Sequence, residues 1–272
     1  MTAHRAPRRT LMASPVLTGS ALVHAGAAAG AVLEPRLWPW ALGAVAANHA
    51  VLTAAGLWPR SRLLGPNWTR LPVNEGPSGM TVALTLDDGP DPGVTPRVLE
   101  RLAQHDAIAT FFCVGERVER YPDLAREIVR RGHAIENHSQ SHRHAFSLLG
   151  PRGMLAEIET AQAAITRVTG IAPMFFRAPA GLRNPFLDPV LTRLQLRLAS
   201  WTRRGFDTVE GNPDLVYRRL TRGLRNGDIL LLHDGNAALT SAGQPVVLDV
   251  LPRLLDTLRE RSLHPVTLRA SV

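Results

Sequence analysis

Thr-Leu-Asp-Asp-Gly, at Thr85–Gly89, is the stretch that decides the fold of this chain of 272 residues. The run Met80–Leu86, which leads into it, is aliphatic and β-branched and ends at a Gly89-Pro90 turn, a pattern that predicts a short buried strand. Asp87 and Asp88 therefore leave the C-terminal end of a strand side by side.

A pair of histidines, His138 and His142 in the sequence His-Ser-Gln-Ser-His, complements the two aspartates. One carboxylate and two imidazoles, with one coordination position left for water, are typical of a catalytic divalent metal site. The remaining carboxylate can act as a base on that water. The same ligand set also occurs in non-haem iron sites, but that alternative explains neither the second aspartate nor Arg177 and His233. His144 is the alternative ligand if His142 is not one.

Further short apolar runs end in, or are followed by, polar residues. Met174–Arg177 ends in an arginine, Arg197–Trp201 is followed by Asp207, and Asp228–Leu232 leads directly into His233. Helical patterns lie between the strands, at Thr95–Gln104, Pro122–Arg131, Met154–Thr169, Pro213–Arg225 and Val246–Arg261. Alternating strands and helices predict an α/β fold in which helices surround a parallel sheet or barrel. We expect the polar residues to meet at the C-terminal ends of the strands, where such folds have their active sites.

The region from Met80 to Leu268 resembles the polysaccharide deacetylase family, which is carbohydrate esterase family four and has the nodulation-type chitooligosaccharide deacetylase homology domain. Thr85–Gly89 is similar to the first motif of the family and His138–His142 to the second. Arg177-x-Pro179 is similar to the third motif, and Leu231-x-His233 to the fifth. The resemblance implies a distorted (β/α) barrel with fewer than eight strands, and metal-dependent removal of acyl groups from amino sugars.

The resemblance also implies which residues would hold the metal. Asp88, His138 and His142 would be the ligands of a divalent cation. Zinc is the expected metal, and cobalt, nickel or manganese would fit the same ligands. Asp87 would be the general base, and Arg177 would form an ion pair that keeps Asp87 oriented and ionised.

His233 would be the general acid of the implied reaction. Asp87 would take a proton from the attacking water, and His233 would protonate the amine that leaves. The main-chain N–H of Ala180 would help to stabilise the oxyanion. Leu231 would form a wall of the small acyl pocket.

The chain departs from the family pattern at three places. The tyrosine that usually follows Arg-x-Pro is Ala180, which is compatible with a role for the backbone N–H alone. The proline that usually follows the second histidine is Arg143. The Asp-Trp pair of the fourth motif is reduced to Asp207-Thr208. Asp207 remains a candidate pocket residue, and Trp201 becomes the candidate for the aromatic wall of the pocket.

Two other functions remain open at this point. The chain could be an O-deacetylase or deformylase that acts on a lipid-linked sugar, or a non-catalytic, membrane-tethered glycan-binding module. Binding alone needs neither Asp87 nor His233, so the sequence favours an enzyme. We therefore predict a hydrolase that removes N-acetyl groups from an acetylated amino-sugar glycan or a lipid-linked sugar.

The composition argues against a nucleic-acid-binding protein. The net charge is +8 and the pI is about 11.2, but all 31 basic residues are arginines, dispersed along the chain without aromatic residues between them. Such usage is typical of a GC-rich bacterial genome rather than of a basic binding patch. The single cysteine, Cys113, excludes an intramolecular disulfide and is compatible with the cytoplasm.

The N-terminal region contains two candidate membrane spans. Thr10–Leu33 and Leu37–Pro59 lack charged side chains, and each exceeds the ~20 residues needed to cross a membrane. Glu34–Arg36 is a tight connection, so we predict a helical hairpin. Tryptophans lie near the segment ends, as expected at membrane interfaces, at Trp38, Trp40 and Trp58. The alternatives are a signal peptide in place of the first span, or one membrane anchor instead of two.

These patterns divide the chain into three parts. We predict a membrane-anchoring segment at residues 1–59, a linker at 60–79 and a catalytic domain at 80–272. Arginines flank the hairpin at both ends, at Arg5, Arg8, Arg9, Arg60, Arg62 and Arg70, whereas its loop carries only Arg36. The positive-inside rule then predicts an inner-membrane protein of a bacterium with both ends in the cytoplasm. With a single inserted span, the catalytic domain would face the periplasm instead.

Overall fold

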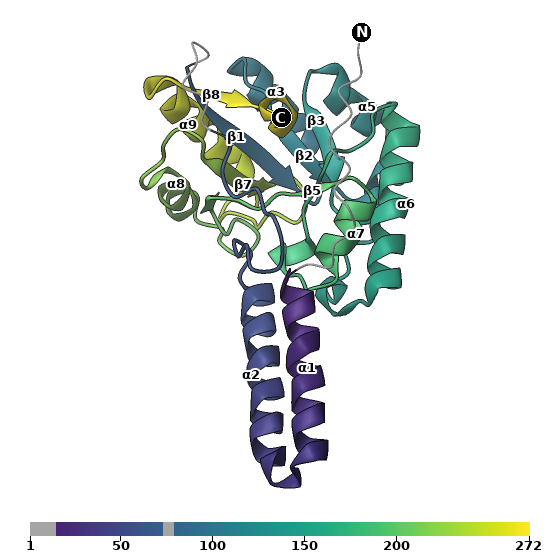
Figure 1. Cartoon of the computed structure of the whole chain (residues 1–272). Helices are drawn as coiled ribbons and strands as arrows, with labels where there is room; N and C mark the ends of the chain where they lie inside the picture. Colours follow the sequence, from purple (N-terminus) through teal and green to yellow (C-terminus); the bar gives the residue numbers. More distant parts are fainter. Residues whose placement is uncertain (1–14, 73–78) are drawn as a thin grey trace.

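The computed structural model describes residues 15–72 and 79–272, which form an α/β body and a helical hairpin that projects from one end of it (Figure 1). The N-terminal part of the described chain forms the hairpin, and everything from Met80 onward belongs to the body.

A single curled parallel sheet lies at the centre of the body, with helices outside it (Figure 1). Neighbouring strands are hydrogen-bonded in the order β5-β4-β3-β2-β1-β7-β6, and β8 pairs with the first half of β1. The strands are β1 (Met80–Asp87), β2 (Thr110–Cys113), β3 (Ala134–Asn137), β4 (Phe175–Phe176), β5 (Arg197–Leu198), β6 (Arg203–Arg204), β7 (Ile229–His233) and β8 (Leu263–Val266). The last six residues of β1 are buried, as expected for a strand covered on both faces. The predicted α/β fold with a distorted parallel barrel is confirmed.

The helices that the sequence predicted between the strands are present and end within a few residues of the predicted positions. They are α3 (Thr95–Gln104), α5 (Pro122–Arg130), α6 (Pro151–Thr169), α8 (Pro213–Thr221) and α9 (Val247–Glu260). The body also contains α4 (Gly115–Arg120), α7 (Leu187–Arg193), and the short 3-10 turns η2 (Phe146–Leu148), η3 (Pro179–Gly181) and η4 (Leu268–Ser271). Proline at the first or second position begins several of these helices, where its missing N–H costs nothing.

Among the described residues, the continuous strand order contains seven strands, which agrees with the expected barrel of fewer than eight, and one further strand brings the sheet to eight. The additional strand is β8, which pairs with β1 outside the main strand order. Between β5 and β7 the sheet is completed by a segment that precedes β1. Trp68 forms a parallel bridge with Ala199, and the N–H of Leu71 donates to the carbonyl oxygen of Gly227 at 2.9 Å.

The segment expected to be a linker is therefore not a free tether over its described part, residues 60–72. Leu64 and Leu71 are almost fully buried, and the side-chain amide of Asn67 donates to the carbonyl oxygens of Pro59 and Ser61. Residues 73–78 lie outside the described part of the chain. Proline and glycine in this region shape a packed turn rather than a flexible connection.

The hairpin consists of α1 (Pro15–Leu33), the short turn η1 (Pro35–Leu37) and α2 (Trp38–Leu57). Each helix is long and apolar enough to cross a membrane, although a signal sequence near the N-terminus would have the same character. Within the hairpin the two helices are joined by polar contacts, including Asn48 Nδ2 to Ser20 Oγ at 2.9 Å. The prediction of two apolar helices is confirmed, and residues 10–14 of the first predicted span lie outside the described residues.

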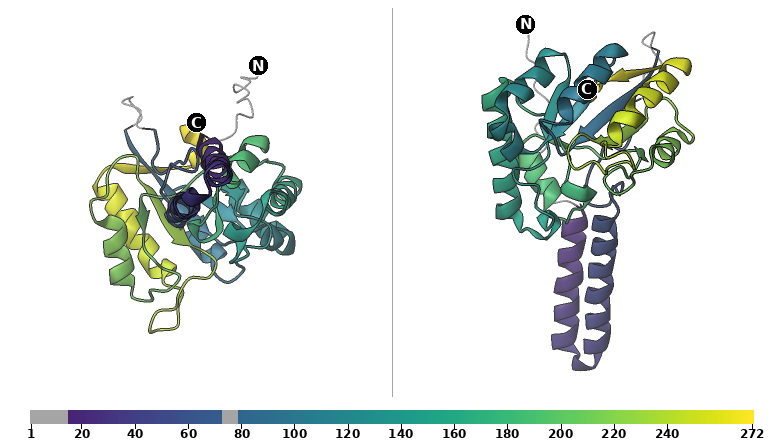
Figure 2. Two further views of the ribbon diagram at one scale, coloured as in Figure 1. Left: turned by 60° about the horizontal axis from the view of Figure 1, so that its bottom comes forward. Right: turned by 180° about the vertical axis from the view of Figure 1, so that it is seen from behind.

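The hairpin is fixed to the body near the C-terminal ends of the strands. The backbone of Gly56 packs so closely on Arg183 that a Cβ atom at Gly56 would lie 2.2 Å from the Arg183 carbonyl oxygen. The hydroxyl of Ser200 donates to the carbonyl oxygen of Pro59 at 2.7 Å. Figure 2 shows the hairpin extending from one end of the body, and in Figure 1 the arrow of β1 points toward that end. The mouth of the barrel and the hairpin are therefore on the same side.

Candidate active site

Asp88, His138 and His142 converge at the C-terminal ends of β1 and β3. Asp88 directly follows β1, and His138 directly follows β3. Asp88 and His142 have φ values of 71° and 47°, which are uncommon for residues other than glycine and often mark functional sites. Oδ1 of Asp88 lies 3.2 Å from Nε2 of His138 and 3.0 Å from Nε2 of His142. The structure thus brings together the three predicted ligands, and the alternative ligand His144 is exposed.

These three residues fit a divalent cation. Among the described residues, Oδ1 of Asp88 has no hydrogen-bond partner although it is buried, because neither histidine contact has hydrogen-bond geometry. Burial would raise the pKa of Asp88, but the two imidazoles outweigh it and hold the pKa below its usual range. Nδ1 of His138 lies 2.8 Å from the carbonyl oxygen of Arg177, which leaves Nε2 as the ligand atom. A buried, unsatisfied oxygen between two imidazole nitrogens is a suitable donor set for zinc and similar metals.

Asp87, the last residue of β1, is paired with Arg177. Nη1 of Arg177 lies 2.6 Å from Oδ1 of Asp87, and both side chains are almost fully buried. Burial lowers the pKa of Arg177, and the charge of Asp87 offsets part of that cost. The remaining donors of the guanidinium reach the hydroxyl of Thr85 and the carbonyl oxygens of Ala199 and Ser200. Arg177 is thus held rigidly from three sides, and it fixes the carboxylate of Asp87 in turn.

His233, the last residue of β7, is oriented by Asp207. The N–H of His233 donates to Oδ2 of Asp207 at 2.7 Å, and Nδ1 lies 2.9 Å from Oδ1. Burial would lower the pKa of His233, but the charge and hydrogen bond of Asp207 outweigh it and raise the pKa to about 9. His233 therefore carries a proton at neutral pH. Asp207, expected among the pocket residues, is fully buried and contacts the imidazole of His233.

The residues expected to shape the acyl pocket lie in the inner layer or at the rim of the barrel. Leu231 and Trp201 are 1% and 7% exposed and belong to the same apolar cluster. The Trp201 ring lies 5.9 Å from the guanidinium carbon of Arg177 and also packs against Gly181. Ala180 is exposed in η3, with a left-handed φ of 54°. Of these three residues, only Ala180 is exposed.

Three further residues are neighbours of the site, and two of them, Thr95 and Asn236, were not identified from the sequence. Nδ2 of Asn236 donates to Oδ2 of Asp88 at 3.1 Å. The hydroxyl of Thr95 donates to Oδ2 of Asp234 at 2.5 Å, and burial raises the pKa of Asp234 to about 7. Gly89 makes room for this carboxylate, since a Cβ atom there would lie 2.2 Å from Oδ2. The His-Asp sequence after β7 was a visible signal for Asp234, but nothing local marks Asn236 or Thr95.

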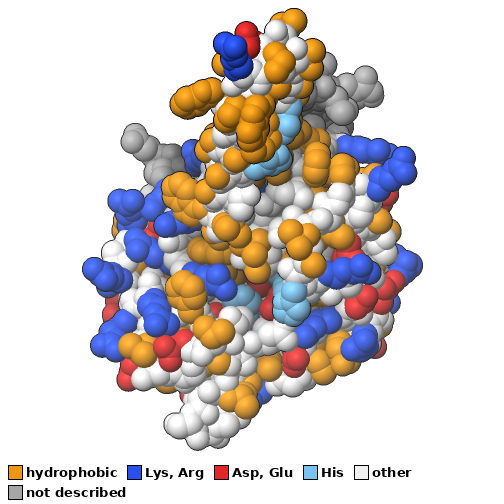
Figure 3. All heavy atoms as spheres, turned by 90° about the horizontal axis from the view of Figure 1, so that it is seen from below, with side chains coloured by type: hydrophobic (Ala, Val, Ile, Leu, Met, Phe, Trp, Pro, Cys, Tyr) orange, Lys and Arg blue, Asp and Glu red, His pale blue; other side chains and the backbone are white. Residues whose placement is uncertain are grey.

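A polar recess of about 210 Å³ opens beside His142. Arg117, Arg120, Ser141 and Asn236 are among the residues that line it. Figure 3 looks onto this end of the molecule past the hairpin, and it shows arginine and histidine side chains among apolar ones. The recess can donate hydrogen bonds to hydroxyl or anionic groups of a ligand next to the proposed metal ligands.

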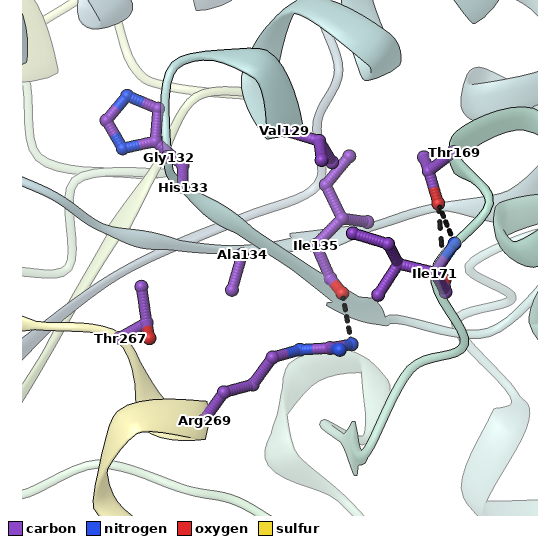
Figure 4. A pocket seen from close by; sticks show the side chains of 9 residues that line it. All are labelled: Val129, Gly132, His133, Ala134, Ile135, Thr169, Ile171, Thr267 and Arg269. Carbon is purple, nitrogen blue, oxygen red and sulfur yellow. Dashed lines mark hydrogen bonds between the residues drawn. The ribbon is translucent and has the colours of Figure 1, made fainter. Parts of the chain in front are cut away.

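A second recess, of about 130 Å³, lies at the other end of the sheet, where β3 begins (Figure 4). Its polar groups are already paired. Arg269 donates to Glu136 and to the carbonyl oxygens of Ile135 and Ala172. Burial lowers the pKa of His133 to about 4, so this imidazole is neutral, and its Nδ1 accepts the N–H of Ala109. This recess has a structural explanation and is not a candidate site.

Comparisons with known proteins agree with the geometry of the mouth. The family model for polysaccharide deacetylase matches residues 74–199. A peptidoglycan-N-acetylglucosamine deacetylase of Bacillus cereus is 32% identical over 188 residues, which cover 68% of this chain and 85% of the relative. A chitooligosaccharide deacetylase of Azorhizobium caulinodans is 34% identical over 156 residues, which cover 57% of this chain and 74% of the relative.

A solved structure shows the same similarity in three dimensions. The family 4 carbohydrate esterase from Streptomyces lividans, in complex with acetate, aligns with a TM-score of 0.63 and 31% sequence identity. The alignment covers 71% of this chain and 95% of that one. The similarity thus extends over nearly all of a solved esterase, and not only over the short motifs.

Proposed function

The chain belongs to the polysaccharide deacetylase family, and on this premise we propose that it is a membrane-anchored hydrolase that removes N-acetyl groups from an amino-sugar-containing glycan or glycolipid. The observation that carries the proposal is the presence, at one end of the sheet, of a metal-ligand set together with two oriented proton-transfer groups. A module that only binds glycans would need the metal-ligand set at most, and would not need the proton-transfer groups.

We assign the general base to Asp87. Its Oδ1 is bound by Arg177, whereas Oδ2 lies 3.8 Å from Nε2 of His138, beyond hydrogen-bond distance. Oδ2 can therefore accept the proton of the attacking water. The positive charge of Arg177 favours the ionised carboxylate that this step requires.

We assign the general acid to His233, which is protonated near neutral pH and fixed by Asp207 at its other nitrogen. An amide breaks only if its nitrogen is protonated as it leaves, and a positioned acid typically contributes ~10²–10⁴-fold to such a step. After the transfer, the charge of Asp207 favours the return of a proton to the imidazole. Asp207 is thus a positioning residue, which acts through His233.

Asp88, His138 and His142 are the proposed ligands of the cation, for which we propose zinc, with cobalt, nickel or manganese able to replace it. When bound, the cation would supply Lewis-acid polarisation and lower the pKa of water to ~7. The N–H of Ala180 is the proposed oxyanion donor from the protein. Leu231 is the proposed wall of the acyl pocket, and Trp201 supports that wall and Arg177 from within the barrel.

We propose that the hairpin anchors the enzyme in the inner membrane of a bacterium. The two helices are exposed along almost their whole length, which is unfavourable in water but not in lipid. Arginines beyond both ends of the hairpin favour a cytoplasmic position for the barrel under the positive-inside rule. The proposed division is an anchor at residues 1–59, a connection at 60–79 and a catalytic domain at 80–272, with the connection packed on the barrel.

Acetate release by the purified full-length protein tests this proposal. N-acetylated chito-oligosaccharides should yield acetate, a chelator should stop the release, and added zinc should restore it. Release of formate from a formylated sugar, or of acetate only from O-acetylated sugars, would favour the deformylase or O-deacetylase alternative. Glycan binding without turnover of any of these substrates would show that the protein is a binding module and that the proposed function is wrong.

A further inference from the structure

The active site opens on the same side as the hairpin, next to an apolar groove between the two parts. We infer that the substrate is an amino sugar attached through a phosphate-containing link to a long apolar chain. The apolar chain of the substrate lies in this groove while its sugar enters the barrel mouth. This inference rests on the proposed function and names the substrate class of the same site.

The groove has a volume of about 360 Å³, within the range of ligand sites, and it is lined mainly by apolar side chains. The hairpin contributes Leu17, Leu52 and Leu57, and the barrel contributes Leu148, Leu182 and Phe186. One wall is thus a surface that we place in lipid, and the other belongs to the catalytic body. An acyl or isoprenoid chain could enter the groove from the bilayer without passing through water.

The barrel wall of the groove is built from the loops that carry the site. Leu148 follows His142 in the loop after β3, and Leu182 follows Ala180 in the loop after β4. The side-chain amide of Asn184 donates to the carbonyl oxygens of Ser147 and Leu149, both at 2.9 Å, and so joins the two loops. A chain in the groove would therefore end beside the loops that hold a proposed metal ligand and the proposed oxyanion donor.

A cationic group lies where the groove meets the barrel. Arg183 lines the groove, is only 4% exposed, and its Nε has no hydrogen-bond partner among the described residues. One of its terminal nitrogens donates to the carbonyl oxygen of Ser61. Burial lowers the pKa of Arg183, and the charge of Asp188 offsets only part of that effect. An anionic phosphate between lipid and sugar would complement this guanidinium better than an uncharged glycan chain would.

The loops around the mouth carry exposed apolar side chains that suit a membrane surface. They follow β3, β4, β6 and β7 and are Leu148, Phe186, Phe206, Val209 and Leu239, with exposed fractions from 42% to 83%. Figure 3 shows apolar side chains on the hairpin and on the face of the body around its base. A body held with this face toward the bilayer would meet substrates that are themselves in the membrane.

A chain-length series on the wild-type protein in phospholipid nanodiscs tests the inference. The probes are N-acetylglucosamine 1-phosphate and its phosphodiesters with alkyl chains of increasing length, with a soluble chito-oligosaccharide as reference. We expect kcat/KM for acetate release to rise with chain length, by up to about fourfold for each methylene that is fully buried. Turnover of the chito-oligosaccharide with no gain from the alkyl chain would overturn the inference and leave the proposed function intact. Failure to release acetate from every probe would instead contradict the proposed function.

Matched variants separate the groove from simple partitioning into the bilayer. Leu52 lines the groove, whereas the adjacent Val51 is 54% exposed and does not. Leu52→Trp should fill the groove. The ratio of kcat/KM for the long-chain phosphodiester to kcat/KM for N-acetylglucosamine 1-phosphate should then fall by about tenfold or more. Val51→Trp adds the same side chain and should keep the wild-type ratio. Equal ratios in the two variants would show that the gain comes from partitioning and that the groove does not hold the chain.

Discussion

Two buried carboxylate–arginine pairs, one at the mouth and one at the recess where β3 begins, which we call the structural end, differ in how fully the carboxylate is satisfied. Glu136 accepts the N–H groups of Met174 and Phe175 with one oxygen and the Nε of Arg269 with the other. At the mouth, Arg177 holds only one oxygen of Asp87. A carboxylate with both oxygens engaged by structural donors stabilises the fold, whereas one with an unused oxygen can take a proton.

The same contrast holds for the histidines at the two ends. His133, near Glu136, is neutral and accepts a main-chain N–H. At the mouth, His138 and His142 face an oxygen that has no hydrogen-bond partner within the described chain, and His233 is protonated. Incomplete satisfaction of buried polar groups, which is costly for folding, therefore distinguishes the proposed active end from the structural end.

The largest expected effect is the loss of the metal at the mouth. His142→Ala removes one of three proposed ligands and should abolish both metal binding and deacetylation. His144→Ala, two residues away on an exposed position, is the matched control and should retain full metal content. Metal analysis of the two purified variants decides the assignment. Retention in the first and loss in the second would show that His144 is the ligand.

Asp87→Asn should come next, because it removes the proposed base without removing a ligand. The rate of deacetylation should fall by ~10²–10⁴-fold while the metal stays bound. The counterpart in the second pair, Glu136→Gln, should retain activity, because both oxygens of Glu136 are bound by structural partners. If Asp87→Asn protein is isolated without metal, the two adjacent aspartates have exchanged roles.

His233→Ala should affect an amide far more than an activated ester. The amine needs a proton in order to leave, so N-deacetylation should fall by ~10²–10⁴-fold. An aryl acetate has a much better leaving group and should keep most of its rate. The two substrates are compared on wild type and variant, and equal losses would assign His233 to positioning rather than to proton donation.

Asp207→Asn should shift the pH dependence with a smaller loss of rate. With the wild-type pKa of His233 at about 9, activity should fall as the pH rises through about 9, because the acid loses its proton. Without the negative charge of Asp207 the alkaline limb should move toward the ordinary histidine pKa of ~6.5. The raised pKa also means that the pair stabilises the fold fully below ~6.5 and loses this contribution as the pH rises through about 9. An unchanged alkaline limb would show that another group is titrating.

The smallest effect on catalysis is expected at the structural end. Glu136→Gln should lower the free energy of unfolding by about 1–3 kcal/mol, because a charge-assisted bond to Arg269 is lost. Metal content and turnover should remain near wild type. A thermal melt measures the loss of stability, and acetate release measures turnover. A large loss of turnover in a folded, metal-loaded variant would remove the distinction between the two ends.

The sequence was sufficient where the chemistry is local in the chain. Asp87 and Asp88 are adjacent, and His138 and His142 share one loop. To predict that each pair lies together, it was enough to locate the end of one strand. The contact between Asp207 and His233 was not predicted, because His233 lies on another strand and nothing in Asp207-Thr208 marks it. Asn236 was missed for the same reason.

The fold could be predicted in its longer elements and not in its shortest ones. Amphipathic helices such as α3 and α5 follow the 3.6-residue period closely. By contrast, β6 consists of two arginines, and β3 contains a fully buried glutamate, so neither has an apolar pattern. The proline- and glycine-rich region at 60–72 was predicted as a linker because its composition does not reveal that it packs beside β5 and β7.

The close contact between Gly56 and the Arg183 carbonyl also has a kinetic consequence. For a protein anchored as proposed, this contact packs the barrel against the hairpin, so the catalytic residues would stay at a nearly constant height above the lipid surface. Groups nearer to or farther from that plane would be out of reach however abundant they are. The turnover rate would then follow the surface density of substrate in the leaflet rather than its concentration in solution, and encounters would depend on lateral diffusion in two dimensions.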